Sequence, residues 1–160
     1  MLQKGKSNIK KILVISLSNI GDVVMTFPVL DILKQDFPQA QLSVVVGPKA
    51  EPLFAGNKNI TRVYPFRKRQ SLPALGRWLL ALRRENFDLV VDLRNTLIPF
   101  LISRRYLTAP FLPRRKGEHM RQQHLNRLRS VYAFERQPRD RYALSVPSET
   151  RLAVQNMLCE

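Results

Sequence analysis

The sequence predicts an α/β fold in which helices cover both faces of a parallel sheet. Residues 12–17 and 42–46 are runs of β-branched and aliphatic side chains without polar alternation, which is typical of strands buried on both faces. Between them, residues 23–37 carry apolar residues at helical spacing. A strand, helix, strand succession of this length predicts a right-handed βαβ unit with its first strand near the centre of the sheet.

The next part of the chain continues this alternation. Pro28 lies inside the first helix, so we expect that helix to begin late or to kink. Residues 72–85 predict an amphipathic helix whose apolar side, with Leu75, Leu79 and Leu82, packs on the sheet. The expected elements in order are a short helix at 49–54, a turn at 55–59, a third strand at 60–65, the helix at 72–85 and a fourth strand at 86–93.

Weaker patterns follow the fourth strand. In the helix expected at 118–133, Leu125 and Leu128 face the core while Arg121, Arg127 and Arg129 point outward. The other expected elements are a short apolar helix at 97–107 broken near Pro99, a loop at 108–117, a short strand or extended linker at 142–147 and a helix at 150–158.

The chain is strongly basic, and this bounds its partners. Its 160 residues suit one domain, and a formal net charge of +15 points to nucleic acid, an acidic membrane surface or a phosphorylated substrate. Residues 104–141 hold eleven Lys or Arg against three acids. Charge alone leaves these three partners open.

Other composition features narrow the class of protein. A single cysteine, Cys159, excludes an internal disulfide and a Cys-rich metal site, and fits a reducing cytoplasm. No window approaches the roughly 20 apolar residues needed to cross a bilayer. Any membrane contact is therefore expected to be peripheral.

Two polar turns are expected at the carboxyl edge of the sheet, where ligands bind in open α/β folds. After the first strand, Gly21 can take backbone angles closed to other residues, and Asp22 either caps the next helix or acts on a substrate. After the fourth strand come Asp92, Arg94, Asn95 and Thr96. Asp92 either binds a ligand or accepts backbone N–H bonds within its own crossover.

Further candidates are less specific. The cluster Arg67-Lys68-Arg69 is either solvated surface or an anion site. His124, within a predicted helix, either packs or takes part in function.

Residues 12–30 carry a Ser-x-x-Gly-Asp turn followed by Thr-x-Pro-x-Leu. This stretch resembles the amino-terminal signature of glycosyltransferase family 9, the ADP-heptose:lipopolysaccharide heptosyltransferase family. Residues 87–93, Phe-Asp-Leu-Val-Val-Asp-Leu, resemble a second family segment. The segment that begins at His124 is similar to a third.

The resemblance implies the GT-B architecture, in which two Rossmann-like domains face each other across a cleft. It implies that residues 1–147 are the Rossmann-like acceptor-binding domain and that 148–160 begin a truncated linker helix toward a missing carboxyl-terminal donor domain. The implied reaction is inverting, metal-independent transfer of a heptose or similar sugar from an ADP-sugar to an acidic lipopolysaccharide-core or related glycan. This fragment alone is expected to be inactive.

The resemblance also assigns roles to residues. Asp22 aligns with the family's general base. The resemblance implies no metal site and no cofactor beyond a nucleotide-sugar, expected to be ADP-heptose and held mainly by the other domain. An acidic acceptor would favour the basic loops. The expected substrate-binding residues are Ser18, Asn19, Gly21, Asp92, Arg94, Asn95, Thr96, His124, Arg67, Arg69, Arg114, Arg115 and Lys116. The expected partners are the ADP-sugar, an anionic glycolipid or glycan acceptor and, by peripheral contact, the acidic inner face of the cytoplasmic membrane.

Two alternatives remain. One is a non-catalytic basic module for anionic ligands or nucleic acid, although no aromatic residues interleave the basic segment as a base-stacking platform requires. The other is a generic nucleotide-binding domain, although the first turn lacks the three-glycine fingerprint. Residues 95–99, Asn-Thr-Leu-Ile-Pro, also depart from the Arg-Ser of many family members, so a different acceptor pocket is expected.

Overall fold

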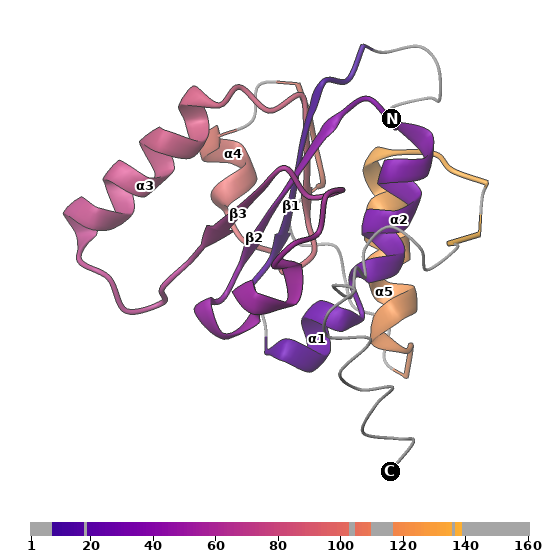
Figure 1. The fold of residues 1–160 in the computed structure, drawn as a ribbon, viewed down its shortest axis with the longest axis horizontal. Helices are drawn as coiled ribbons and strands as arrows, with labels where there is room; N and C mark the ends of the chain where they lie inside the picture. The colour runs from indigo at the N-terminus through magenta and orange to yellow at the C-terminus, as the bar shows by residue number, and fades with distance from the viewer. Residues whose placement is uncertain (1–7, 18, 103–104, 110–116, 136, 139–160) are drawn as a thin grey trace.

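The computed structural model describes residues 8–17, 19–102, 105–109, 117–135 and 137–138. They form a five-stranded parallel sheet in the order β3-β2-β1-β4-β5, with helices on both faces (Figure 1). The strands are β1 Lys11–Ser16, β2 Gln41–Val46, β3 Arg62–Pro65, β4 Leu89–Asp92 and β5 Tyr106–Leu107. The α/β, Rossmann-like fold predicted from the sequence is confirmed.

β1 is the central strand, as its unbroken apolar run predicts. Val14 pairs with Val44 of β2 on one side and with Val91 of β4 on the other. Successive side chains of a strand point to opposite faces, so Ile12 and Val14 enter one core while Leu13 and Ile15 enter the other. All five strands are parallel, so the turns that follow them gather at one edge of the sheet.

One face of the sheet is covered by α2 and α5, which lie side by side (Figure 1). Every residue of α2 from 27 to 33 is buried, and the hydroxyl of Tyr132, just after α5, donates to Asp36 Oδ2 at 2.9 Å. The elements on this side are α1 Ile20–Val24, α2 Phe27–Asp36, the 3₁₀ helix η1 Pro48–Phe54 and α5 Met120–Val131. We call this side the α2–α5 face.

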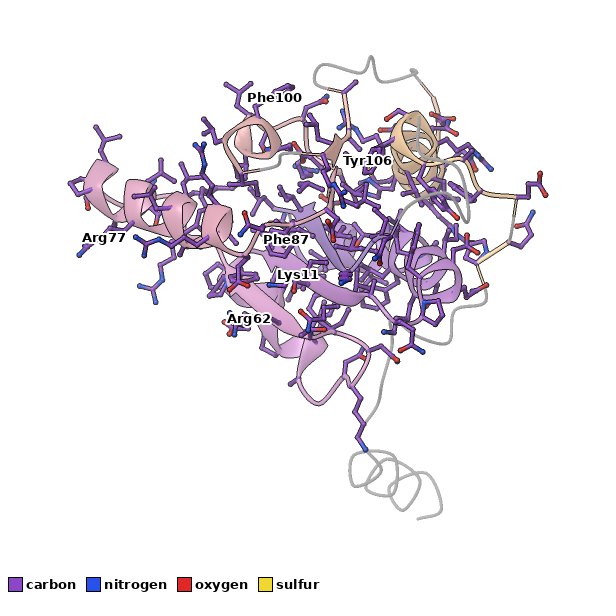
Figure 2. All side chains as sticks on the ribbon, turned by 90° about the horizontal axis from the view of Figure 1, so that it is seen from above. Lys11, Arg62, Arg77, Phe87, Phe100 and Tyr106 are labelled. Carbon is purple, nitrogen blue, oxygen red and sulfur yellow. The ribbon has the colours of Figure 1, made fainter. Side chains whose placement is uncertain are left out.

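The other face is covered by α3 Leu72–Arg84 and α4 Ile98–Ile102. Its core is smaller, with Leu82, Ile98 and Ile102 packed on the strands. Leu82 is the single fully buried residue of α3, while Leu75 and Leu79 are half-buried. The prediction that the apolar side of this helix packs on the sheet is confirmed for Leu79 and Leu82, which join this core, while the start of α3 extends away from the sheet (Figures 1 and 2).

The helix predicted at 23–37 is two helices. α1 ends at Val24 and α2 begins at Phe27, and the hydroxyl of Thr26 between them donates to the carbonyl of Val23 at 2.6 Å. Pro28 lies in the first turn of α2, where its missing N–H leaves no helical bond unmade. The late helix start expected from Pro28 is confirmed.

The prediction of a short apolar helix over 97–107, broken near Pro99, is confirmed for α4 and wrong about the proline and the end of the segment. Pro99 lies in the first turn of α4, where a proline is tolerated, and Tyr106 and Leu107 form the edge strand β5 against β4. The free edge of β4 recruits this pair of residues, which is too short to show a pattern of its own. The predicted elements at 142–147 and 150–158, and the domain boundary after residue 147, lie outside the described residues.

Candidate functional site

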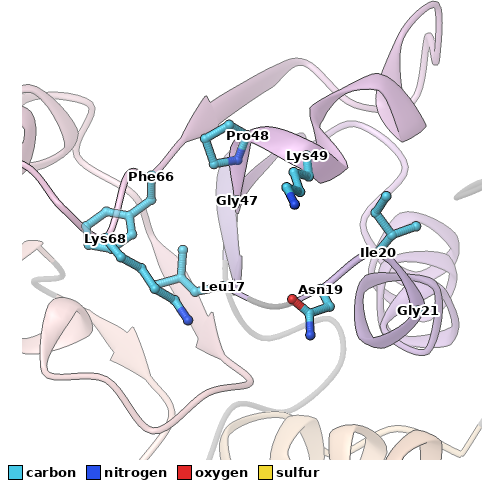
Figure 3. A pocket seen from close by; sticks show the side chains of 9 residues that line it. All are labelled: Leu17, Asn19, Ile20, Gly21, Gly47, Pro48, Lys49, Phe66 and Lys68. Carbon is cyan, nitrogen blue, oxygen red and sulfur yellow. The ribbon is translucent and has the colours of Figure 1, made fainter.

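A cavity of about 610 Å³ opens at the carboxyl edge of the first three strands (Figure 3). Its walls come from the turns that follow β1, β2 and β3. The lining residues are Leu17, Asn19, Ile20, Gly21, Gly47, Pro48, Lys49, Phe66 and Lys68.

The cavity combines apolar walls with positive charge. Leu17, Pro48 and Phe66 supply apolar surface, and the amines of Lys49 and Lys68 point toward the same space as the Asn19 amide (Figure 3). A few convergent polar groups on an apolar wall are typical of a ligand site. The lining of this cavity suits a ligand that combines apolar surface with an acidic group.

Asp22 lies next to the cavity, one residue beyond Gly21 and in the first turn of α1. Its Oδ2 is 3.6 Å from Nη1 of Arg94, which follows β4, and its side chain is 38% exposed. The ion pair joins the two turns that the sequence places at this edge.

The structure answers two questions about this turn that the sequence leaves open. Asn19, and not Asp22, is the N-cap residue of α1, and its side chain makes no capping bond. Gly21 is helical, whereas the positive-φ glycines among the described residues are Gly56 and Gly117. A Cβ at Gly21 would meet open space, so the glycine widens the cavity wall and is not needed for a special backbone angle.

Asp92 organises the second turn from inside the protein. Its carboxylate accepts the backbone N–H of Arg94 at 2.7 Å, the backbone N–H of Thr96 and the Thr96 hydroxyl at 2.9 Å. Burial raises the pKa of Asp92, and these hydrogen bonds oppose the shift. The structure therefore favours the alternative in which Asp92 accepts hydrogen bonds within its own crossover. The turn that Asp92 holds in this way places Arg94 beside Asp22.

Arg127 holds the same turn from α5. It donates to the backbone carbonyl of Asp92 at 2.8 Å and to Oδ1 of Asn95, whose φ of 58° is the left-handed conformation that Asn tolerates. The prediction that Arg127 points outward is wrong. Arg127 borders the buried stripe of α5, and the acceptors of the turn stabilise its guanidinium there.

The other candidates divide into three groups. Arg67 and Arg69 are exposed and do not line the cavity, although Lys68 between them does. His124, 2% exposed, is enclosed in the core side of α5 and is not among the lining residues. Ser18, Arg114, Arg115 and Lys116 lie outside the described residues.

Sequence reasoning missed Lys49 and Phe66, and it named Lys68 only as one of three neighbouring cations. Each follows a strand, β2 or β3, and so reaches the same edge as the turns after β1 and β4. Applying the carboxyl-edge rule to all four strands finds them. Within the described ranges no three His, Cys, Asp or Glu side chains gather to hold a metal ion, and no described helix is long and apolar enough to cross a membrane.

Comparison with solved structures identifies the fold. No family model and no curated protein matches the sequence. A glycosyl transferase family 9 structure from Veillonella parvula matches with a TM-score of 0.71 and 20% identity, over 94% of this chain and 49% of that one. The chain has a glycosyltransferase family 9 fold.

Two Escherichia coli structures with this fold also match. Heptosyltransferase WaaC with ADP-2-deoxy-2-fluoro heptose gives a TM-score of 0.63 at 18% identity, over 82% of this chain and 52% of that one. ADP-heptose lps heptosyltransferase II gives 0.61 at 18% identity, over 92% and 50%. The chain therefore spans about half the length of the family 9 structures that it matches.

Proposed function

We propose that this chain is the acceptor-side half of a family 9-like glycosyltransferase. The reaction is transfer of a heptose or similar sugar from an ADP-sugar to a hydroxyl of an acidic lipopolysaccharide-core or related glycan, with inversion and without a metal. The observation that carries the proposal is the carboxylate of Asp22, held by Arg94 at the rim of a cavity that contains two lysines. The family 9 fold supports it.

Asp22 would act as the general base. An acceptor hydroxyl is a poor nucleophile, and a carboxylate within hydrogen-bond reach takes its proton as the hydroxyl attacks the anomeric carbon. Arg94, 3.6 Å away, keeps the carboxylate at the rim of the cavity. Because Asp22 directly follows the cavity residue Gly21, the acceptor hydroxyl would lie between the cavity and this carboxylate.

The cavity would bind the acceptor. Lys49 and Lys68 pair with carboxylate or phosphate groups of the glycan, and the ring of Phe66 supplies an apolar wall for a sugar face. Basic side chains and helix ends would stabilise the departing diphosphate, which the other half of such an enzyme would hold. The site would work at the inner face of the cytoplasmic membrane on an anionic glycolipid.

The test is Asp22→Asn in the protein as its source cell makes it, whose intact mass would be about twice 18.6 kDa if it carries a donor half. We expect turnover with ADP-heptose to fall by roughly 10²–10⁴-fold, the usual worth of a general base. Acceptor binding, measured by calorimetry with deacylated core glycan, should stay within a factor of about three, since the substitution leaves both cavity lysines in place.

Glu135→Gln is the matched control, because it removes one exposed acid from the α2–α5 side of the molecule. Near-normal turnover of Asp22→Asn would remove Asp22 from the mechanism. Glycan binding without transfer in the native protein would instead favour the alternative, a basic binding module.

A further inference from the structure

The face of α3 and α4 carries most of the exposed apolar surface in the described part of the chain. Among all described residues, eight large apolar side chains are exposed, and five of these eight belong to α3, α4 or the residue before α4. Leu72 is 83% exposed and Phe100 is 49% exposed. The five, which define the α3–α4 surface, are Leu72, Leu80, Leu97, Phe100 and Leu101.

This surface adjoins the cavity. α3 and α4 contact each other, and α4 begins just after the turn that follows β4, so Leu97 lies at the carboxyl edge of the sheet, where the cavity opens. The ring of Trp78 in α3 packs against the cavity residue Phe66, with centroids 5.1 Å apart. Figure 2 shows Phe100 on the outer side of α4.

The charge around this surface has one sign. Residues 66–84 contain six Lys or Arg and no acid, and α4 contains no acid. All six basic side chains are exposed: Arg67, Lys68, Arg69, Arg77, Arg83 and Arg84. Leucines with Trp and Arg on one exposed helix are typical of segments that lie in a membrane interface, where the apolar parts enter the acyl boundary and the cations meet headgroups.

We propose that the α3–α4 surface docks on an anionic lipid bilayer. Its apolar side chains are spread over two helices and accompanied by cations, whereas the centre of a protein interface is depleted of charge. A fluid surface of phosphate headgroups satisfies both the leucines and the arginines. Docking through this surface would bring the cavity to the bilayer, so the inference deepens the proposed function. It rests on the proposed function only for the idea that the acceptor is linked to lipid.

The experiment is sedimentation of the 160-residue chain with vesicles. We expect binding to vesicles of equal phosphatidylglycerol and phosphatidylethanolamine, weakened by salt, and little binding to phosphatidylcholine alone. Phe100→Ser with Leu101→Ser should weaken binding at least tenfold, since two partly exposed apolar side chains no longer enter the acyl boundary. Arg77→Gln should weaken it about fivefold, and Arg84→Gln by a similar factor.

The matched control variant lies on the opposite face of the sheet. Arg129→Gln on α5 removes an exposed arginine away from the α3–α4 surface and should leave vesicle binding within a factor of two. Urea unfolding of each variant checks that the fold is kept. The assay contains no sugar donor, so its failure leaves the proposed transfer standing, and failure of transfer leaves vesicle binding standing.

Three outcomes would overturn the inference. The first is no binding to anionic vesicles, and the second is binding that the α3 and α4 substitutions leave unchanged. The third is a concentration-dependent dimer, seen by light scattering, that Phe100→Ser with Leu101→Ser dissociates, because the surface would then be an interface between two copies of the chain.

Discussion

The two faces of the sheet are covered in different ways. On the α2–α5 face, seven consecutive residues of α2 are buried and α5 adds five more. On the opposite face, α3 is the longest described helix and buries a single residue fully, Leu82. The helix layer on the α2–α5 face is thus buried more deeply than the layer on the opposite face.

The tightly packed face also fixes the site. Arg127 reaches from α5 to the turn after β4, and that turn presents Arg94 to Asp22. The loosely packed face contributes apolar and basic surface beside the cavity. Packing on one side therefore sets geometry, while exposure on the other leaves surface for a partner.

At the amino edge of the sheet, the loosely packed face is joined to the strands by charged groups. Glu85, at the end of α3, pairs with Arg62 at 2.7 Å and with Lys11 at 3.4 Å. Figure 2 shows Lys11 and Arg62 near Phe87 at the start of β4. Exposed ion pairs of this kind contribute little each, so electrostatics there supplements a small core.

The largest expected difference in stability between the two faces comes from truncating one leucine on each. Leu33→Ala in α2 empties a fully buried site and should lower the free energy of unfolding by about 3 kcal/mol. Leu80→Ala in α3 removes a mostly exposed side chain and should change it by less than about 0.5 kcal/mol. Urea unfolding monitored by circular dichroism measures both.

Equal losses of unfolding free energy in the two variants would contradict the proposed difference in packing between the two faces. A loss at Leu80 comparable to that at Leu33 would mean that α3 is packed in solution, and the exposed leucines would then no longer mark a docking surface.

A smaller effect tests whether the tightly packed face holds the site. Arg127→Met keeps an apolar stem but leaves the carbonyl of Asp92 and the amide of Asn95 without their donor. We expect a loss of about 2 kcal/mol in the free energy of unfolding, the usual penalty for buried acceptors left unsatisfied. Arg129→Met on the exposed side of the same helix should cost less than about 0.5 kcal/mol.

A readout at the site separates positioning from simple stability. With the turn after β4 loosened, Arg94 should no longer hold Asp22, so turnover should fall at least as far as in Arg94→Met. Wild-type turnover in a folded Arg127→Met protein would show that the turn keeps its shape without α5.

Most of the fold is readable from the sequence because its signals are long. The continuous apolar runs of β1, β2 and β4 identify buried parallel strands, and their order along the chain leaves few topologies. β5 could not be read, since two residues carry no periodicity and their place is set by the free edge of β4. The degree of burial of α3 could not be read either, because an amphipathic pattern shows which side is apolar and not how much of it is covered.

The sequence predicts where the site lies better than it predicts which side chains line it. The carboxyl-edge rule places Asp22 and Arg94 at one edge from chain order alone. In the loop after β3, however, no periodicity tells which of three consecutive cations enters the cavity, and it is Lys68. Arg127 was misplaced for a related reason: a helical wheel treats an arginine as solvent-seeking, whereas here acceptors from another turn satisfy it.

The smallest expected effect on stability depends on pH and comes from one carboxylate. Asp88, between α3 and β4, accepts the backbone N–H groups of Lys10 and Lys11 and pairs with Arg105. Burial alone would raise the pKa of Asp88, but the two backbone hydrogen bonds and Arg105 outweigh it and lower that pKa below the ordinary 3.8. The folded state therefore gains stability from the charged form, present above pH 3.8 and lost as the pH falls through the folded-state pKa.

Asp88→Asn should accordingly cost about 1 kcal/mol in the free energy of unfolding at neutral pH, since amide groups replace charge-assisted acceptors. The gap between wild type and Asp88→Asn should close as the pH falls below 3.8. The gap between wild type and Leu33→Ala should stay constant over the same range, because a cavity does not titrate. If both gaps closed together, acid would be loosening the whole fold, and the two faces would not differ in the forces that hold them.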